Sequence, residues 1–356
     1  MMTSSEQVLV LDAGKVLYTF DKKGRITASK TYQELNVPAS VAKMQLVDNI
    51  LYLAMSNDGS LYSCDLTNWQ CGIVPGFSKV ARRTFGFAVT KKYIYITDTS
   101  RHTLKTFDKT GELIANSRGT SVPLCYPNQL SFIDGELYVA DTNNHRLAII
   151  DTSDLTALKI DTAIAITGDN NVWDIIMSAR NLPSWCIPIS DKILEDKGDA
   201  YIERAFDFNE KMTPSAPDLA RRGRIWPTAF EYNNGDWWIL AGNNGFTNGD
   251  VLIYRDDKAI KRINDNIEEF DPIDIELFQQ DMLVSDFVSM QILKFSENGN
   301  WMGEFGDLTF QQDMRKLKNL KARYKSYISV AQKSIFILVL FAFLIAILDR
   351  IYKKKS

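Results

Sequence analysis

A strand–turn–strand pattern recurs along this chain at a spacing of about 43 residues. Its clearest copies are residues 94–108, IYITDTSRHTLKTFD, and residues 137–151, LYVADTNNHRLAIID. Asp98 and Asp141 occupy the same point of the two copies, 43 residues apart. Strands of alternating apolar residues that repeat every 40–50 residues are typical of propeller blades, each a small antiparallel sheet. The sequence therefore predicts an all-β fold, a ring of blades.

The number of copies predicts a six-bladed β-propeller over residues 1–310. The interval from Asp141 to Ala241, the equivalent point of a later copy, is 57 residues longer than one repeat. We interpret this excess as an insertion at about 154–224, and a degenerate seventh blade is the alternative. Because the first copy begins at a second strand, its blade needs an inner strand from elsewhere, and we expect residues 308–310 to supply it.

One blade resembles a known family. Residues 126–151, YPNQLSFIDGELYVADTNNHRLAIID, are similar to the consensus blade of NHL-repeat β-propellers, and a fainter resemblance covers most of residues 8–307. The resemblance implies a rigid disc whose loops bind proteins or peptides. Some NHL relatives bind RNA instead. Residues 1–310 carry a net charge of −12, which opposes RNA binding because phosphate contacts need a cationic face.

Acidic residues end the second strand of several copies, at Asp12, Asp98, Asp141 and Asp286. An Asp at such a position commonly caps backbone NH groups, which is the interpretation we favour. The alternative is a set of oxygen ligands for calcium, because lactonase-like and amidating-lyase propellers, which are related to the fold of the resembled family, bind such metals. The candidate ligands are Asp98, Asp141, Asn143 and Asn144. The lyase type also uses several histidines, and this chain has two.

The two histidines fall at one repeat position, His102 in SRHTL and His145 in NNHRL. The NHL consensus commonly has Asn-His-Arg at this turn, so the resemblance implies a repeat feature, and we assign no catalytic residue. Paired bases on adjacent blades are the alternative. Each histidine has an arginine neighbour, which we expect to pair with nearby acids or with a protein partner. The candidate partner-binding residues are Arg101, His102, His145 and Arg146.

A second local feature is the pair Cys64 and Cys71, which flanks DLTNWQ. A two-residue turn at Thr67 and Asn68 would place the two cysteines directly opposite each other on a hairpin, within disulfide range. Two free thiols are the interpretation that we favour. A disulfide, the alternative, would indicate an oxidising compartment.

The C-terminal region contains fourteen consecutive apolar residues, from Ile335 to Leu348. With their flanks they make a nineteen-residue segment, 334–352, which as a helix is roughly 28 Å long. We expect a long C-terminal α-helix that spans a membrane in this segment. A buried core helix is the alternative. The residues that we expect in the membrane are Ser334, Ile335, Phe336, Leu340, Leu344, Leu348 and Tyr352.

Basic residues surround this segment, so that residues 311–356 carry a net charge of +9. Residues 311–333 combine a helical apolar stripe with Lys and Arg, which predicts a juxtamembrane helix near acidic headgroups or against a partner. A solvated linker helix is the alternative, and 353–356 form a basic tail. Seven basic residues precede the span and four follow it, and no secretory signal begins the sequence. We therefore expect the propeller on the cytoplasmic side.

Together these features favour a non-enzymatic propeller held at a lipid bilayer by one helix. It would act as a protein-binding scaffold or an accessory subunit of a membrane complex, with other membrane subunits around the helix and a protein or peptide on a propeller face. No cofactor is required, although calcium fits the acids. The alternative is a calcium-dependent, lactonase-like propeller hydrolase or lyase with a central metal site.

Overall fold

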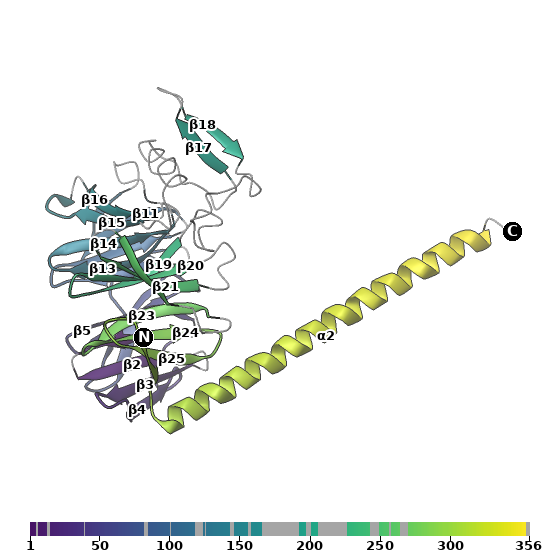
Figure 1. Cartoon of the computed structure of the whole chain (residues 1–356), viewed down its shortest axis with the longest axis horizontal. Helices are drawn as coiled ribbons and strands as arrows, with labels where there is room; N and C mark the ends of the chain where they lie inside the picture. The colour runs from purple at the N-terminus through teal and green to yellow at the C-terminus, as the bar shows by residue number, and fades with distance from the viewer. Residues whose placement is uncertain are drawn as a thin grey trace. The chain divides into compact units, whose positions relative to one another are not determined.

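The computed structural model divides the chain into two compact units, Met1–Asp307 and Leu308–Ser356 (Figure 1). Side chains from 341 onward are not described. The residues that the structure describes are 1–4, 6–12, 15–38, 40–81, 85–99, 101–117, 124, 126–142, 146–155, 158–165, 192–196, 201–205, 226–242, 249–255, 258–263 and 270–353.

The first unit contains six four-stranded antiparallel sheets, so the predicted six-bladed propeller is confirmed. Blades 1 to 3 consist of β1 (Met2–Thr3), β2 (Gln7–Leu11), β3 (Val16–Asp21), β4 (Ile26–Thr31); β5 (Val41–Val47), β6 (Ile50–Met55), β7 (Leu61–Asp65), β8 (Gln70–Ile73); and β9 (Phe85–Val89), β10 (Tyr93–Asp98), β11 (Thr103–Asp108), β12 (Leu113–Asn116). Blades 4 to 6 consist of β13 (Pro127–Ile133), β14 (Glu136–Asp141), β15 (Arg146–Asp151), β16 (Lys159–Ala165); β19 (Trp226–Asn233), β20 (Asp236–Gly242), β21 (Gly249–Arg255), β22 (Lys258–Ile263); and β23 (Pro272–Phe278), β24 (Asp281–Asp286), β25 (Gln291–Phe295), β26 (Trp301–Glu304).

The stretch between blades 4 and 5 does not form a seventh four-stranded sheet within the described residues. Its first part, β16, is the outer strand of blade 4, where it pairs with β15. Further along, β17 (Lys192–Asp196) and β18 (Tyr201–Ala205) pair with each other as a two-stranded sheet. The rest of 166–225 lies outside the described residues.

The ring closes differently from our expectation. Residues 308–310 do not supply the inner strand of blade 1, because they begin a helix. Instead β1, at the start of the chain, pairs with β2 through Met2↔Leu9 and Thr3↔Val8. The inner strands contact one another in the order β1, β5, β9, β13, β19, β23 and back to β1, which completes the ring. A two-residue strand is too short to carry a periodic pattern, so sequence periodicity could not indicate it.

Neighbouring blades pack through both faces of their central strands. In β20, Trp238 and Leu240 face the cluster shared with blade 6, whereas Ile239 and Ala241 face the cluster shared with blade 4, where they meet Tyr138. Successive side chains of a strand point to opposite faces, so an unbroken apolar run can serve two interfaces. Burial of both faces explains why the middle of each second strand is largely apolar.

Blades 3 and 4 also approach closely at their inner strands. A Cβ atom on Gly86 in β9 would lie 1.7 Å from the backbone oxygen of Asn128 in β13. A glycine is required here because any side chain would force the two strands apart.

The second unit is α2 (Leu308–Lys353), one helix of 46 residues, which confirms the expected long C-terminal helix. In the part of α2 with described side chains, Ile335, Phe336 and Leu340 are more than half exposed, and the Ser334 hydroxyl donates to the Val330 carbonyl at 2.9 Å. Among the described residues, no helix has an apolar stretch long enough to cross a bilayer. Residues 341–352, which include the expected membrane residues Leu344, Leu348 and Tyr352, have side chains outside that set.

Candidate functional site

The inner strands of all six blades surround a polar cavity, which we call the central channel. It has a volume of about 100 Å³ and its walls include Met2 of β1, Phe87 of β9 and polar residues of the other inner strands. Lys43 lies on β5, Gln129 on β13 and Glu231 on β19. Asp274 and Glu276 lie two residues apart on β23, which places both on the same face of that strand. Three carboxyl groups from two neighbouring blades therefore line the channel.

This crowding changes the titration of two of the acids. Burial raises the pKa of Glu231 to about 7; the backbone NH of Tyr232 opposes this rise and the charge of Asp274 adds to it. Burial is also the main reason why the pKa of Glu276 lies well above its usual range, and the charges of Glu231 and Asp274 raise it further. Both side chains are half-buried and enclosed by neighbouring inner strands, so solvent stabilises their charged forms poorly.

The N-terminal strand binds at the same place. The Met1 ammonium group forms an ion pair with the Asp274 carboxylate. The Thr3 hydroxyl donates to the Leu277 carbonyl at 2.6 Å and to the Glu276 carboxylate at 3.4 Å. The Met1 charge and the Thr3 hydroxyl lower the pKa of Glu276, against the larger effect of burial. The acids of β23 thus fix β1 beside blade 6.

The size of the channel limits its chemistry. A volume of about 100 Å³ admits a few water molecules, at roughly 30 Å³ each, but not a drug-sized ligand, for which pockets measure about 300–1,000 Å³. A carboxyl group that titrates near neutral pH can exchange a proton with such water. Within the described residues, no group of three or more His, Cys, Asp or Glu side chains could hold a metal ion.

The repeated aspartates bind groups of their own blades. Asp98 and Asp141 are fully buried. The Asp98 carboxylate lies 3.3 Å from Arg101 Nη1 and 3.6 Å from Lys105 Nζ. Asp141 accepts a hydrogen bond of 2.8 Å from Arg146 Nε. These contacts occupy the two carboxylates that the calcium hypothesis needs.

The other two members of this set cap turns. Asp12 accepts from the backbone NH of Val16 at 2.7 Å. Asp286 accepts from the NH groups of Asp271 and Ser289, each at 2.8 Å. Backbone capping, the interpretation favoured from the sequence, describes both residues.

The partner-binding candidates occupy different environments. Arg146 is 6% exposed and contacts Asp141, so its guanidinium lies inside blade 4, whereas the Arg101 side chain is 57% exposed. His102 has a positive φ of 58° and accepts a hydrogen bond from the Tyr126 backbone NH at 3.1 Å. Burial lowers the pKa of His102, although the charges of Asp141 and Asp98 oppose this. His145, Asn143 and Asn144 lie outside the described residues.

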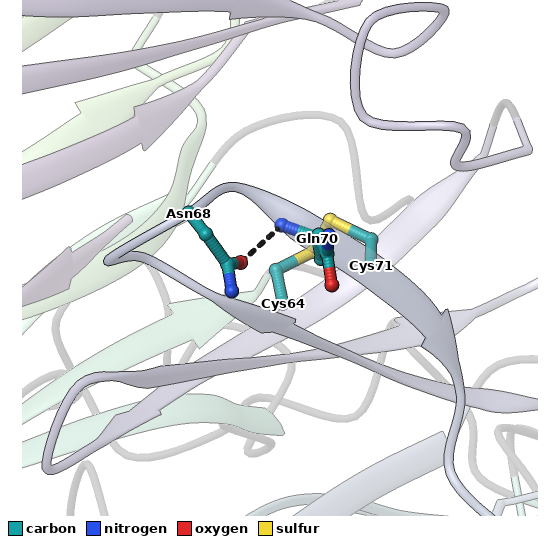
Figure 2. Close-up of a disulfide and its surroundings, with 4 residues drawn as sticks. All are labelled: Cys64, Asn68, Gln70 and Cys71. Atoms are coloured by element: carbon teal, nitrogen blue, oxygen red, sulfur yellow. Dashed lines mark hydrogen bonds between the residues drawn. A yellow bond between two sulfur atoms is a disulfide. The ribbon is translucent and has the colours of Figure 1, made fainter.

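Cys64 and Cys71 form a disulfide between β7 and β8 (Figure 2). The two residues are direct partners in the strand register, and the loop between the strands has four residues, 66–69, not two. Figure 2 shows the Asn68 side chain in this loop accepting a hydrogen bond from the Gln70 NH, at 2.9 Å. Of the two alternatives left open by the sequence, the structure therefore contains the bonded one and not the free thiols that we favoured.

Sequence reasoning missed the acids of the channel. Glu231 lies on β19 and Asp274 and Glu276 lie on β23. Each alternates with apolar neighbours such as Phe230 and Ile275, which are fully buried. A signal was available, because an acid that alternates with apolar residues in a strand cannot share their apolar contacts between blades, which leaves the central channel as a place where it is solvated. The aspartates at the strand ends are the more evident candidates in the sequence, because they recur at the repeat spacing.

Comparison with known proteins agrees with this architecture. The NHL repeat family model matches residues 124–150, a segment that covers β13, β14 and most of β15. No curated protein matches the chain. One chain of a solved nidogen/laminin complex is similar with a TM-score of 0.52 at 12% identity, and the match covers 85% of this chain and 94% of that one.

Two lyase structures are also similar to this chain. A streptogramin B lyase has a TM-score of 0.47 at 14% identity, with 80% of this chain and 89% of the other covered. A virginiamycin B lyase from Staphylococcus aureus has a TM-score of 0.42 at 13% identity, with 79% and 92% covered. At such identities the likeness shows the fold alone, and no activity follows from it.

Proposed function

We propose that this protein is a membrane-anchored propeller that acts as a protein-binding scaffold or as an accessory subunit of a membrane complex. The observation that carries this proposal is the combination of a closed six-bladed ring with a 46-residue helix whose second half contains the apolar run 335–348. The ring buries its repeated acids in contacts within its own blades. A nidogen/laminin complex contains a chain of this fold, which supports a protein partner.

The helix has the composition of an anchor. Lys333 precedes the apolar run and Arg350 follows it, and both side chains are long enough to reach the headgroup zone. Within the described part of the run, Ile335, Phe336 and Leu340 are each more than half exposed, and residues 335–348 contain no polar residue. Such a surface is stable in lipid and poorly stable in water.

Membrane attachment predicts resistance to alkaline extraction. We expect the full chain to remain in the membrane pellet after a carbonate wash. In the double variant Leu338→Lys/Leu340→Lys, the fraction of protein in the supernatant should rise more than tenfold, because each charge is costly in a bilayer centre. Immunoblotting of both fractions measures this. The matched control is Ile260→Lys/Ile273→Lys in the propeller, which should stay in the pellet. Release of the wild-type chain would contradict the anchor.

We propose that the propeller lies on the cytoplasmic side of the membrane. The seven basic residues before the apolar run support this side, whereas the Cys64–Cys71 disulfide supports an oxidising compartment. In the cytoplasm, reductants would keep the pair as thiols. Because Cys64 is fully buried, the cells are lysed in a denaturant that contains a thiol-alkylating reagent. We expect both cysteines to be alkylated before any reduction, as measured by mass spectrometry. Protection of both until a reductant is added would place the ring on the oxidising side.

The scaffold role is tested by its partners. Extraction in a mild detergent, followed by identification of the co-purifying chains, should recover the protein in a complex of defined stoichiometry. Deleting 334–352 should remove membrane subunits from that complex while soluble partners of the ring remain. Recovery of the wild-type chain as a lone monomer would overturn the role.

The second candidate function is a calcium-dependent hydrolase or lyase. The observation in its favour is the presence of three carboxyl groups in the central channel, one of which has a pKa near neutral pH and could act as a general acid or base. These groups are not placed to hold a metal ion by themselves, so a calcium ion would need further ligands. Calorimetric titration with calcium chloride decides between the two functions. One equivalent bound by the wild-type chain and lost in Glu231→Gln or Glu276→Gln would favour the enzyme. No bound calcium favours the scaffold.

A further inference from the structure

The outer edge of blade 2 is unprotected. Strand β8, Gln70–Ile73, is the last strand in its sheet and pairs with β7 alone among the described strands. Its sequence, QCGI, contains no charged residue and no proline. Exposed edge strands normally carry such residues because they prevent pairing with other chains. The outer strand of blade 5, β22, follows that rule with Lys258, Lys261 and Arg262.

The backbone of β8 is also accessible. Gln70, Gly72 and Ile73 are exposed, with 47% of the Ile73 surface open. A Cβ atom placed on Gly72 would meet no atom within 4 Å. The face of the sheet at Gly72 is therefore open, so the side chains of an added strand would not be blocked there.

A groove lies next to this edge. Its walls come from the segment that joins blades 1 and 2 and from the two outer strands of blade 2, and its volume is about 700 Å³. This volume falls in the range of about 300–1,000 Å³ that is typical of binding pockets. The side chains that matter here are Tyr32, Val37, Pro38, Tyr62 and Ile73.

The groove is electrically neutral on a strongly acidic body. None of its described lining residues is charged, although residues 1–310 carry a net charge of −12. Two copies of such a body repel each other, which opposes edge-to-edge pairing of this chain with itself. An uncharged segment of another protein meets no such penalty.

We propose that β8 and this groove bind an extended, uncharged segment of a partner protein, which adds to blade 2 as a fifth strand. Backbone hydrogen bonds to β8 supply affinity, and alternate side chains of the segment enter the groove, where apolar or aromatic groups contact Tyr32 and Tyr62. The four residues of β8 set the length of the paired segment at about four to six residues. This inference rests on the proposed scaffold function, since it names the kind of partner.

The test begins with a peptide library. Phage that display eight-residue peptides without charged residues are selected on the full-length protein in detergent, and the most enriched sequence is synthesised with a fluorescent label. Fluorescence anisotropy gives its Kd, and hydrogen exchange measured by mass spectrometry locates its site. We expect the peptide to slow amide exchange in residues 70–73 and to leave β22 and β26, the outer strands of blades 5 and 6, which carry charged residues, unchanged.

A matched pair of variants makes the test specific. Ile73→Lys adds edge protection to β8 and should raise the Kd at least tenfold, whereas Ile260→Lys makes the same change on β22, where the isoleucine is 50% exposed, and should alter it less than twofold. A second β8 variant, Gly72→Glu, tests the same strand with an independent change. Circular dichroism checks that all three variants are folded.

Several results would overturn the inference. These are a failure to enrich any peptide above a selection without protein, an unchanged Kd in both β8 variants, or protection of a different strand. A dimer in sedimentation that Ile73→Lys dissociates would replace the partner by a second copy of the chain. Peptide binding by a protein that co-purifies with no other chain would leave this site intact and reject the proposed complex. A stable complex without peptide binding at β8 would reject this site and leave the proposed complex intact.

Discussion

Replacement of Asp141 by alanine should lower the free energy of unfolding by about 3–5 kcal/mol. The Asp141 carboxylate is fully buried and lies 2.8 Å from Nε of Arg146, which is itself 6% exposed. The variant removes the carboxylate that faces this buried guanidinium, and the charge that stays behind is expensive to keep out of water. Urea denaturation of the purified chain, followed by circular dichroism, measures the loss.

The matched control for this prediction is Asp98→Ala on the neighbouring blade. Asp98 occupies the same repeat position and is equally buried, but water can solvate its partner Arg101, whose side chain is 57% exposed. Its second partner, Lys105, is 13% exposed and keeps a hydrogen bond of 2.7 Å to the Val80 carbonyl in the variant. We expect a smaller loss, about 1–3 kcal/mol. The double variant Asp141→Leu/Arg146→Met should recover much of the stability. Equal losses in the two single variants would show that burial of the arginine does not set the cost.

Stability should fall as the pH rises from about 5 to 8, because of the central channel. The pKa of Glu231 rises to about 7 in the folded protein, from an ordinary value of 4.5, and that of Glu276 rises well above the same value. Between these pH values the folded state holds protons that the unfolded state has released, so the slope of stability against pH is negative. The contribution of Glu231 is complete below pH 4.5 and is lost as the pH reaches about 7.

The variant Glu231→Gln isolates this effect. The wild-type chain should lose about 3 kcal/mol more than this variant between pH 5 and 8, at about 1.4 kcal/mol for each pKa unit. Comparison with the variant cancels the opposite slope that His102 contributes, since burial lowers its pKa. Acids whose pKa is lowered, such as Asp108, act below pH 4 and do not overlap this window.

Chemical denaturation at four pH values provides the measurement. Glu112→Gln, at an exposed acid on blade 3, serves as the control and should follow the wild-type curve. If Glu231→Gln also follows that curve, the carboxyl group is charged and well solvated in the folded protein, and the channel is more open to water than the structure indicates.

The sequence alone determined the blades of this protein and its long terminal helix, because both arise from local periodicity. Alternation with a period of two makes strands, and a copy every 43 residues makes similar four-stranded units. The pairing of Cys64 with Cys71 could also be proposed from the sequence, since seven residues separate them within one hairpin. Contacts between residues that are only a few positions apart are determined by the local sequence.

Only the tertiary structure decided how the ring closes and what lies at its centre. The first residues form a strand because blade 6 presents Asp274 to Met1 and the Leu277 carbonyl to Thr3, at separations of 273 and 274 residues along the chain. Glu231 and Glu276 belong to different blades, and the charge of one affects the titration of the other only where the inner strands converge. Such interactions depend on distance in space, and the pattern of residues along one strand does not show which distant residues will lie close to it.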